Sequence, residues 1–141
     1  MFKKILITAD LGHLEDAEKA VKTALEMTQN NPDTVYRVMS VVPPFGSSFV
    51  SSSFLPKNFD QDVLSEANKA LHAFTKKHFP EGAKVQHILA HGPVYEEIIR
   101  IAKEKNIDLI IMMAVRDNKE GLSSNTVKVA RYSDKPVLIL R

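Results

Sequence analysis

The sequence contains no cysteine. Disulfide bonds, cysteine-ligated metals and thiol chemistry are therefore excluded, and the compartment expected is the cytoplasm. Long apolar runs are also missing. The longest, from Leu109 to Val115, is far shorter than the ~18 residues that span a membrane, and the run from Ile5 to Ala9 is too short for a signal peptide. Because 19 basic and 17 acidic residues nearly cancel, nucleic acid is not expected as a partner.

Glycine is scarce as well, with 5 residues in the chain. They form neither the G-x-x-x-x-G-K-[ST] loop of P-loop proteins nor a G-x-G-x-x-G fingerprint, and the G-x-S-x-G elbow of hydrolases is absent. The 5 histidines show no metal-ligand spacing. His72 and His78, on one expected helix, are not aligned for a single ion and should lie at the surface. No catalytic or metal-binding residue is therefore predicted.

Short apolar runs alternate with amphipathic segments along the chain. Strands are expected at residues 5–9, 34–42, 84–90, 109–113 and 136–140. Helices are expected at residues 13–29, 59–78, 93–105 and 123–132. This alternation predicts one α/β domain over residues 1–141, with an open, Rossmann-like, five-stranded parallel sheet in the order 3-2-1-4-5 and helices on both faces.

The most informative stretch runs from Asp108 to Thr126. It reads as a fully buried strand, a polar loop and the start of a helix. In such sheets ligands bind beyond the carboxyl ends of the strands at the switch point of the strand order, here beside Asp10 and Ala114. Residues 123–126, Ser-Ser-Asn-Thr, place hydroxyl groups and free backbone N–H groups at the helix start. These residues could bind an anion such as phosphate, or could merely cap the helix.

Other polar residues near this crevice each have two interpretations. Asp10 follows the first strand, where its carboxylate could accept hydrogen bonds from an adenine amino group or a ribose hydroxyl, or could cap the next helix. Arg116 could pair with phosphates or could be solvated. His13 and His91 also fall near the carboxyl ends of strands, where either could contact a ligand.

The segment from Pro43 to Asn58 is the one shift in composition, rich in serine with interspersed phenylalanine. Loops of this length in compact domains are commonly functional or disordered. One interpretation is a flap that folds back near the crevice. The other is an inert insertion whose aromatic residues pack on a neighbouring helix.

Three segments together resemble the universal stress protein family over essentially the whole chain. They are KKILITAD at the start, AHGPVYEEIIRIAKEKNIDLIIM in the third quarter and SSNTVKVARYSDKPVLILR at the end. The last is the most specific, because the family has a G-[ST]-N-type helix start before a final P-V-L-V-V-R strand. The resemblance implies an adenine-nucleotide alpha-hydrolase-like fold, usually as a homodimer, and ATP at the carboxyl ends of strands one, two and four in the nucleotide-binding branch.

Carried over by position, Asp10 would face adenine, Val41 would line the base pocket, and Ser123 and Ser124 would hold phosphate. The residues expected to bind the nucleotide are Ala9, Asp10, Val41, Ala114, Arg116, Ser123, Ser124 and Asn125. The cofactor expected is ATP with Mg²⁺. The dimer is expected to form through the edge strand Pro136 to Leu140.

The chain departs from the family's G-x2-G-x9-G-[ST] motif, because Ala114 stands at the first glycine and Ser123 at the last. A serine forced to a positive φ at position 123 would cost roughly 1 kcal/mol, which would weaken binding without abolishing it. Two functions follow as hypotheses. One is a stress-linked protein that uses ATP as a regulatory ligand or hydrolyses it slowly. The other is a dimeric interaction module that binds no nucleotide.

Overall fold

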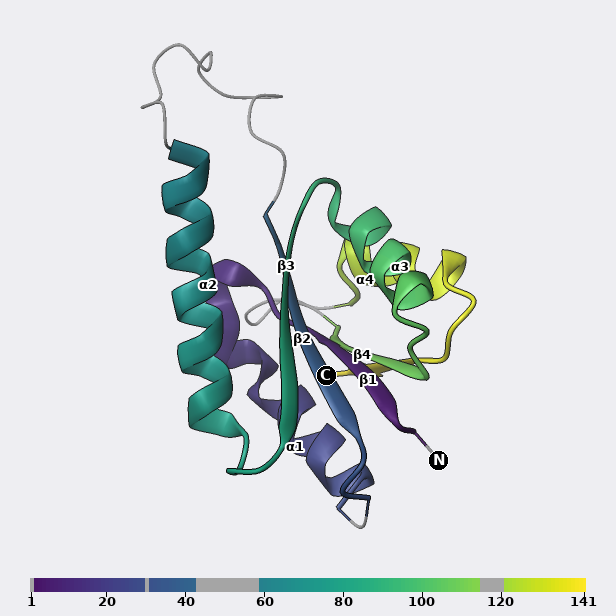
Figure 1. The fold of residues 1–141 in the computed structure, drawn as a ribbon. Coiled ribbons are helices and arrows are strands. Elements are labelled where there is room, and N and C mark those ends of the chain that lie inside the picture. The colour runs from purple at the N-terminus through teal and green to yellow at the C-terminus, as the bar shows by residue number, and fades with distance from the viewer. Residues whose placement is uncertain (1, 30, 43–58, 115–120) are drawn as a thin grey trace.

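The computed structural model describes residues 2–29, 31–42, 59–114 and 121–141. They form a parallel five-stranded sheet in the order β3-β2-β1-β4-β5 (Figure 1). The strands are β1 (Lys4–Thr8), β2 (Val35–Val42), β3 (Lys84–His91), β4 (Leu109–Met113) and β5 (Val137–Leu140). The helices are η1 (Leu11–Ala17), α1 (Glu18–Met27), α2 (Phe59–His78), α3 (Val94–Glu104) and α4 (Ser124–Tyr132). The predicted fold class and strand order are confirmed, and the predicted loop from Pro43 to Asn58 lies outside the described residues.

The helix expected at residues 13–29 differs from the structure in its first part. Residues 11–17 form the 3-10 helix η1, and the α-helix begins only at Glu18. His13 interrupts η1 with a φ of −148° and a ψ of 50°. Gly12 directly precedes it, and glycine is a poor helix former, which favours a tighter and irregular first turn over a continuous α-helix.

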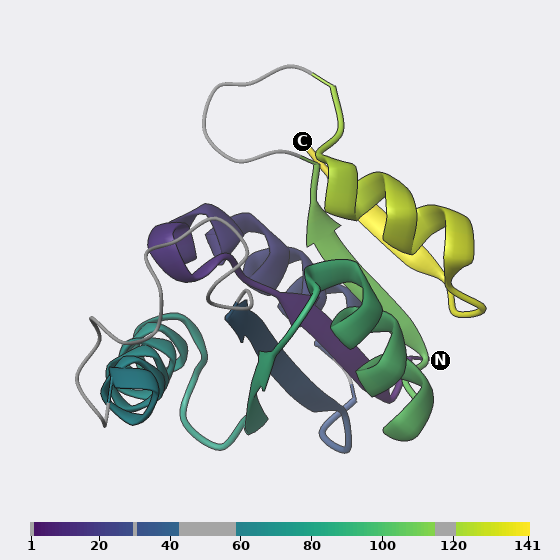
Figure 2. The same cartoon turned by 90° about the horizontal axis from the view of Figure 1, so that it is seen from above.

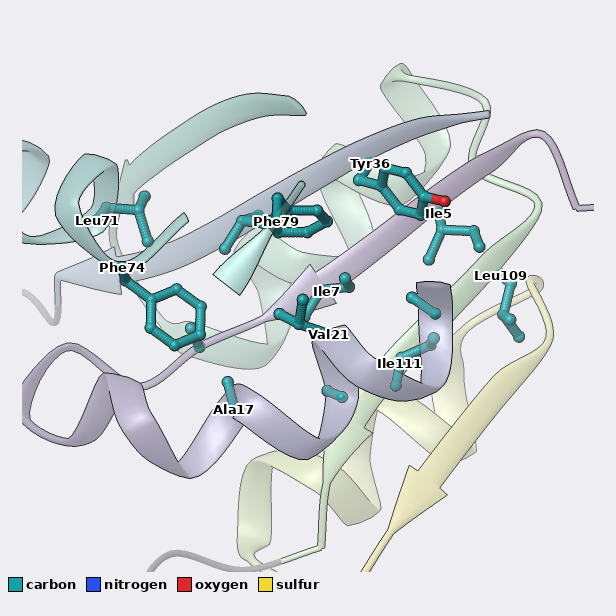
Figure 3. Close-up of a cluster of buried hydrophobic side chains, with 14 residues drawn as sticks. Ile5, Ile7, Ala17, Val21, Tyr36, Leu71, Phe74, Phe79, Leu109 and Ile111 are labelled. Atoms are coloured by element: carbon teal, nitrogen blue, oxygen red, sulfur yellow. The ribbon is translucent and has the colours of Figure 1, made fainter. Parts of the chain in front are cut away.

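Helices cover both faces of the sheet (Figures 1 and 2). On one face α1 and α2 bury a cluster that includes Ile7, Val21, Leu71 and Phe74 (Figure 3). On the other face α3 and α4 bury a second cluster, in which Ile110 of β4 is fully buried. Strands in the middle of such a sheet are apolar on both faces, and this explains why Leu109–Met113 carries no polar residue.

The amino ends of β1 and β4 are joined by one side chain. Oδ2 of Asp108 accepts hydrogen bonds from the backbone N–H groups of Lys3 and Lys4, at 3.0 and 2.9 Å. The backbone N–H of Asp108 in turn donates to the carbonyl oxygen of Lys4 at 2.8 Å. These three hydrogen bonds therefore tie the amino ends of β1 and β4 together.

None of the helices in the described ranges is long and apolar enough to cross a membrane.

One surface residue was wrongly predicted from the helical spacing. His72 is exposed, as expected, but the side chain of His78 is only 9% exposed, because it packs beside the ring of Phe74 with 4.7 Å between ring centroids.

Candidate ligand-binding site

A pocket of about 690 Å³ opens at the carboxyl ends of β1, β2 and β4. This volume lies within the range of ~300–1,000 Å³ that is usual for small-molecule sites. Three further elements complete its walls: η1, the start of α3 and the start of α4. The structure therefore has a cavity where the strand order predicted a crevice.

The apolar part of the pocket lies between the sheet and α3. Met39 and Val41 of β2 line it together with Val94 and Ile98 of α3 and Met112 of β4. Met39 is fully buried, whereas Val41 is half-buried. The faces of a flat aromatic ring such as a purine base could pack here, because these side chains offer an apolar surface.

The polar part of the pocket is the first turn of α4. Oγ of Ser123 accepts a hydrogen bond from the backbone N–H of Thr126 at 3.1 Å and lies 2.7 Å from the hydroxyl of Thr126. The Thr126 hydroxyl donates to the carbonyl oxygen of Met113 at 3.1 Å. Ser123 is thus the N-cap of α4, and Thr126 fixes that turn to the end of β4. Helix starts of this kind carry a partial positive charge that favours anions.

Strain at position 123 was wrongly expected. Ser123 has a φ of −65° and a ψ of 156°, the extended geometry normal for an N-cap residue. The left-handed conformation falls two residues earlier, at Gly121, with a φ of 82°. Ala114 is unstrained too, because Asn106 is the only non-glycine residue of the described ranges with a positive φ. The missing family glycines therefore cause no backbone strain at these two positions.

Ala114 serves as a backbone junction and is not among the described residues that line the pocket. Its N–H donates to the carbonyl oxygen of Leu140 at 2.6 Å, and its own carbonyl oxygen accepts from the N–H of Ser123 at 2.8 Å. It is 1% exposed. It therefore links the ends of β4 and β5 to the start of α4.

Asp10 lies on the pocket wall, and the backbone before it is held in place by β2. The N–H of Ala9 donates to the carbonyl oxygen of Met39 at 2.8 Å, and the buried hydroxyl of Ser40 donates to the carbonyl oxygen of Ala9 at 2.7 Å. The side chain of Asp10 makes no capping hydrogen bond to η1. Capping, one of the two interpretations of this residue, is therefore not its role in this structure.

The charge of the described pocket wall is acidic. Asp10 and Asp16 line it, together with His13. No lysine or arginine is among the lining residues in the part of the chain that the structure describes. A polyphosphate bound here would therefore need a counterion or the backbone N–H groups of α4.

Six of the eight residues predicted for the site line this pocket: Ala9, Asp10, Val41, Ser123, Ser124 and Asn125. Arg116 falls outside the described residues. His13 lies on the wall, whereas His91 is not among the described lining residues. The structure therefore brings these side chains together, and their part in binding remains a prediction.

Sequence reasoning missed Ser40 and Asp16, and it placed Thr126 at the helix start without predicting its buried hydrogen bonds. Ser40 and Thr126 are buried polar residues, 1% exposed each, and their hydroxyl groups fix the two turns of the site. Asp16 adds a second carboxylate. Ser40 interrupts an apolar strand and Thr126 follows the cap at the spacing of one turn, so both left a signal; Asp16 resembles any charged residue of an amphipathic helix.

Comparisons with known proteins agree over the full length of the chain. A sequence model of the universal stress protein family matches residues 1–141. Universal stress protein YxiE of Bacillus subtilis is 27% identical over 150 residues, and universal stress protein G of Shigella flexneri is 25% identical over 146 residues. Each alignment covers 100% of both chains.

Solved structures also resemble this chain over nearly its full length. The chain matches the structure of hypothetical protein MJ0577, from Methanocaldococcus jannaschii, with a TM-score of 0.82 and 27% identity, over 99% of this chain and 96% of that one. It matches a universal stress protein in complex with cAMP with a TM-score of 0.60 and 19% identity, over 99% and 97% of the two chains. The second match shows the fold alone.

Proposed function

Because the chain belongs to the universal stress protein family, we propose that its pocket binds an adenine nucleotide, ATP with Mg²⁺, in a stress-response role. One observation carries the proposal. An apolar part and a hydroxyl-rich helix start belong to a single pocket of about 690 Å³. A nucleotide has the matching parts, a flat base and an anionic phosphate chain.

The proposed roles follow the two parts of the pocket. The base lies against Val41, and the carboxylate of Asp10 accepts a hydrogen bond from the adenine amino group or a ribose hydroxyl. The phosphates lie at the start of α4, near Ser123, Ser124 and Asn125, whose side chains line the pocket. Mg²⁺ offsets repulsion between the phosphates and the carboxylates of the wall. A universal stress protein of the same fold is in complex with cAMP, which is also an adenine compound with a phosphate.

ATP is proposed as a regulatory ligand or as a slowly hydrolysed one. The proposal assigns no residue of the pocket wall to catalysis. Hydrolysis is therefore not required by the proposal. The cytoplasmic location expected from the sequence remains a prediction.

The test is calorimetry of the purified protein with ATP and Mg²⁺, preceded by mass spectrometry for any nucleotide that co-purifies. We expect micromolar affinity, reduced at least about tenfold in Asp10→Ala, because a ligand donor then loses its acceptor. Asp33→Ala is the matched control. Asp33 is exposed near the opposite end of the sheet, with Lys84 at 3.7 Å as its ion-pair partner, and its loss should leave affinity unchanged.

A second function rests on the charge of the pocket. Two carboxylates and no lysine or arginine among the described lining residues would suit a module that binds no nucleotide and acts through protein contacts. Calorimetric silence at millimolar ATP, with folded protein, would favour this alternative. Equal ATP binding by Asp10→Ala and wild type would instead place the nucleotide outside the proposed site.

Under either function we propose a homodimer formed through the edge strand, Pro136 to Leu140. In the described part of the chain β5 pairs only with β4, and all four of its residues are half-buried. A free apolar strand edge is a template for pairing with a second copy.

Ile139→Lys tests the dimer better than a change at Leu138, because Leu138 packs against the first core cluster and Ile139 belongs to neither cluster. Light scattering should report a monomer for Ile139→Lys and a dimer for wild type. A folded variant that is still a dimer would exclude this strand as the interface.

A further inference from the structure

Away from the pocket, three side chains that can ligate metals converge from segments far apart in the sequence. They are Glu15 of η1, Glu18 at the first position of α1 and His78 at the last position of α2. One ligand atom from each lies within 4.8 Å of the others. The fold creates this arrangement, because η1 packs against α2 and Glu15 contacts Lys77 and His78 at the end of that helix. No local motif in the sequence indicates it.

The imidazole of His78 is fixed in place, whereas the two carboxylates are accessible. The side chain of His78 is 9% exposed and lies beside the ring of Phe74. Its Nε2 atom lies 2.8 Å from Oε2 of Glu15. The side chains of Glu15 and Glu18 are 56% and 42% exposed. A solvated ion can therefore reach the carboxylates first and then the imidazole nitrogen.

Both carboxylates are ionised at neutral pH. The pKa of Glu15 is lowered by its hydrogen bonds with His78 and Lys77, and that of Glu18 by its hydrogen bond with Lys22. The two lysines lie 3.2 and 3.0 Å from the carboxylate oxygens, with side chains that are largely exposed. Exposed ion pairs of this kind contribute little and exchange readily. Each lysine therefore pairs with one carboxylate when no metal is bound, and a divalent ion can displace it.

We propose that Glu15, Glu18 and His78 bind a divalent transition-metal ion, with Zn²⁺ as the preferred ion. Two carboxylate oxygens and one imidazole nitrogen suit Zn²⁺, whereas Mg²⁺ and Ca²⁺ prefer ligand sets made of oxygen alone. Around tetrahedral Zn²⁺ the ligand atoms lie roughly 3.4 Å apart. Small side-chain rotations reach that spacing from the observed one. Nε2 of His78 must be free of a proton to ligate, and water completes the coordination.

The ion would join η1 and α1 to the carboxyl end of α2. Because metal binds the folded chain and has no such site in the unfolded one, it stabilises the fold by mass action. η1 also supplies His13 and Asp16 to the wall of the pocket. Glu15, Glu18 and His78 are not among the described lining residues, so the metal site is separate from the pocket.

The experiment is a Zn²⁺ titration of untagged, chelator-treated protein by calorimetry, without nucleotide. We expect one site of micromolar affinity, weakened at least about tenfold in each of Glu15→Gln, Glu18→Gln and His78→Gln. Glu26→Gln is the matched control, because Glu26 is an exposed glutamate of α1 that should not alter affinity. Lys22→Gln should tighten binding, because it releases Glu18.

Three results would overturn the proposal. One is no Zn²⁺ binding by folded wild-type protein at millimolar concentration. Another is unchanged affinity in Glu15→Gln and Glu18→Gln, both surface changes that should leave the fold intact by circular dichroism. The third is loss of the site in His72→Gln, because His72 and His87 stack with 3.6 Å between ring centroids and would then be the ligands instead.

Discussion

Two aspartates at opposite ends of β1 serve different purposes. Asp108, at the amino end, accepts hydrogen bonds from the backbone N–H groups of Lys3 and Lys4. Asp10, beyond the carboxyl end, is exposed and lines the pocket. The residue type is the same, but Asp108 joins two strands through their backbone, whereas Asp10 lies on the wall of a cavity.

The difference indicates which end of the sheet has residues that stabilise the fold and which end has residues available for binding. At the amino ends of the strands a carboxylate can join two neighbouring strands, because no ligand has to bind there. At the carboxyl ends the connections diverge to opposite faces and leave a crevice. Exposed polar side chains on the wall of that crevice contribute little to folding, so changes to them should alter binding more than stability.

The largest effect on folding is expected from Asp108→Ala. It removes the acceptor of two backbone hydrogen bonds at a half-buried position, which should lower the free energy of unfolding by about 2 kcal/mol. Urea unfolding measures this, and calorimetry on the folded variant should show unchanged ATP affinity. Asp108→Asn, which keeps a carbonyl acceptor, should lose less. Reduced ATP affinity in a folded Asp108→Ala would contradict the separation of the two ends.

A smaller loss is expected from Thr126→Val, at the carboxyl end. The change keeps the shape of the side chain but removes the hydroxyl that contacts Ser123 and donates to the carbonyl of Met113. Because Thr126 is 1% exposed, the cost should be about 1–2 kcal/mol, measured by urea unfolding. Thr126→Ser keeps the hydroxyl group and should preserve the cap at the cost of one methyl group. An effect of Thr126→Val on stability as small as that of a surface change would show that this turn does not rely on the hydroxyl.

Asp10→Ala should change stability by less than about 0.5 kcal/mol, since its side chain is exposed and does not cap η1. The same variant is expected to lose ATP affinity, whereas Asp108→Ala is expected to lose stability and keep its ATP affinity. Urea unfolding in the absence of ligand measures the first effect. A loss of stability comparable to that of Asp108→Ala would make Asp10 a structural residue and remove the contrast between the ends.

The sequence predicted the fold well because the signals for it are local and repeated. The buried strand Leu109–Met113, the prolines that end segments and the alternating elements fix the class and the order of the sheet. The family resemblance was confirmed over residues 1–141. Of the site, the sequence predicted the positions at the ends of strands, since these follow from topology alone.

What could not be predicted depends on contacts between distant segments. His78 was expected at the surface, but its side chain packs beside Phe74 and faces Glu15, which is 63 residues away in the sequence. The pairing of Ser40 with the carbonyl of Ala9 spans 31 residues. The strain expected at Ser123 was wrong for a related reason. The family motif located a glycine, but only the backbone path shows which residue takes the positive φ.

The smallest effect is expected from Ser123→Gly, which restores the family's residue. Because Ser123 has a φ of −65°, glycine relieves no strain, and a glycine N-cap in place of serine costs only a few tenths of a kcal/mol. ATP affinity should therefore stay within about twofold of wild type, within the limits of calorimetry. Ser123→Ala, which removes the cap without adding backbone freedom, should lower the free energy of unfolding by about 1 kcal/mol and serves as the comparison.

A large gain in affinity for Ser123→Gly would mean that the phosphates must approach the backbone more closely than the Cβ of Ser123 allows. The carboxyl end would then be a weakened nucleotide site, whereas an unchanged affinity would show that its hydroxyl-capped helix start serves in place of the glycine.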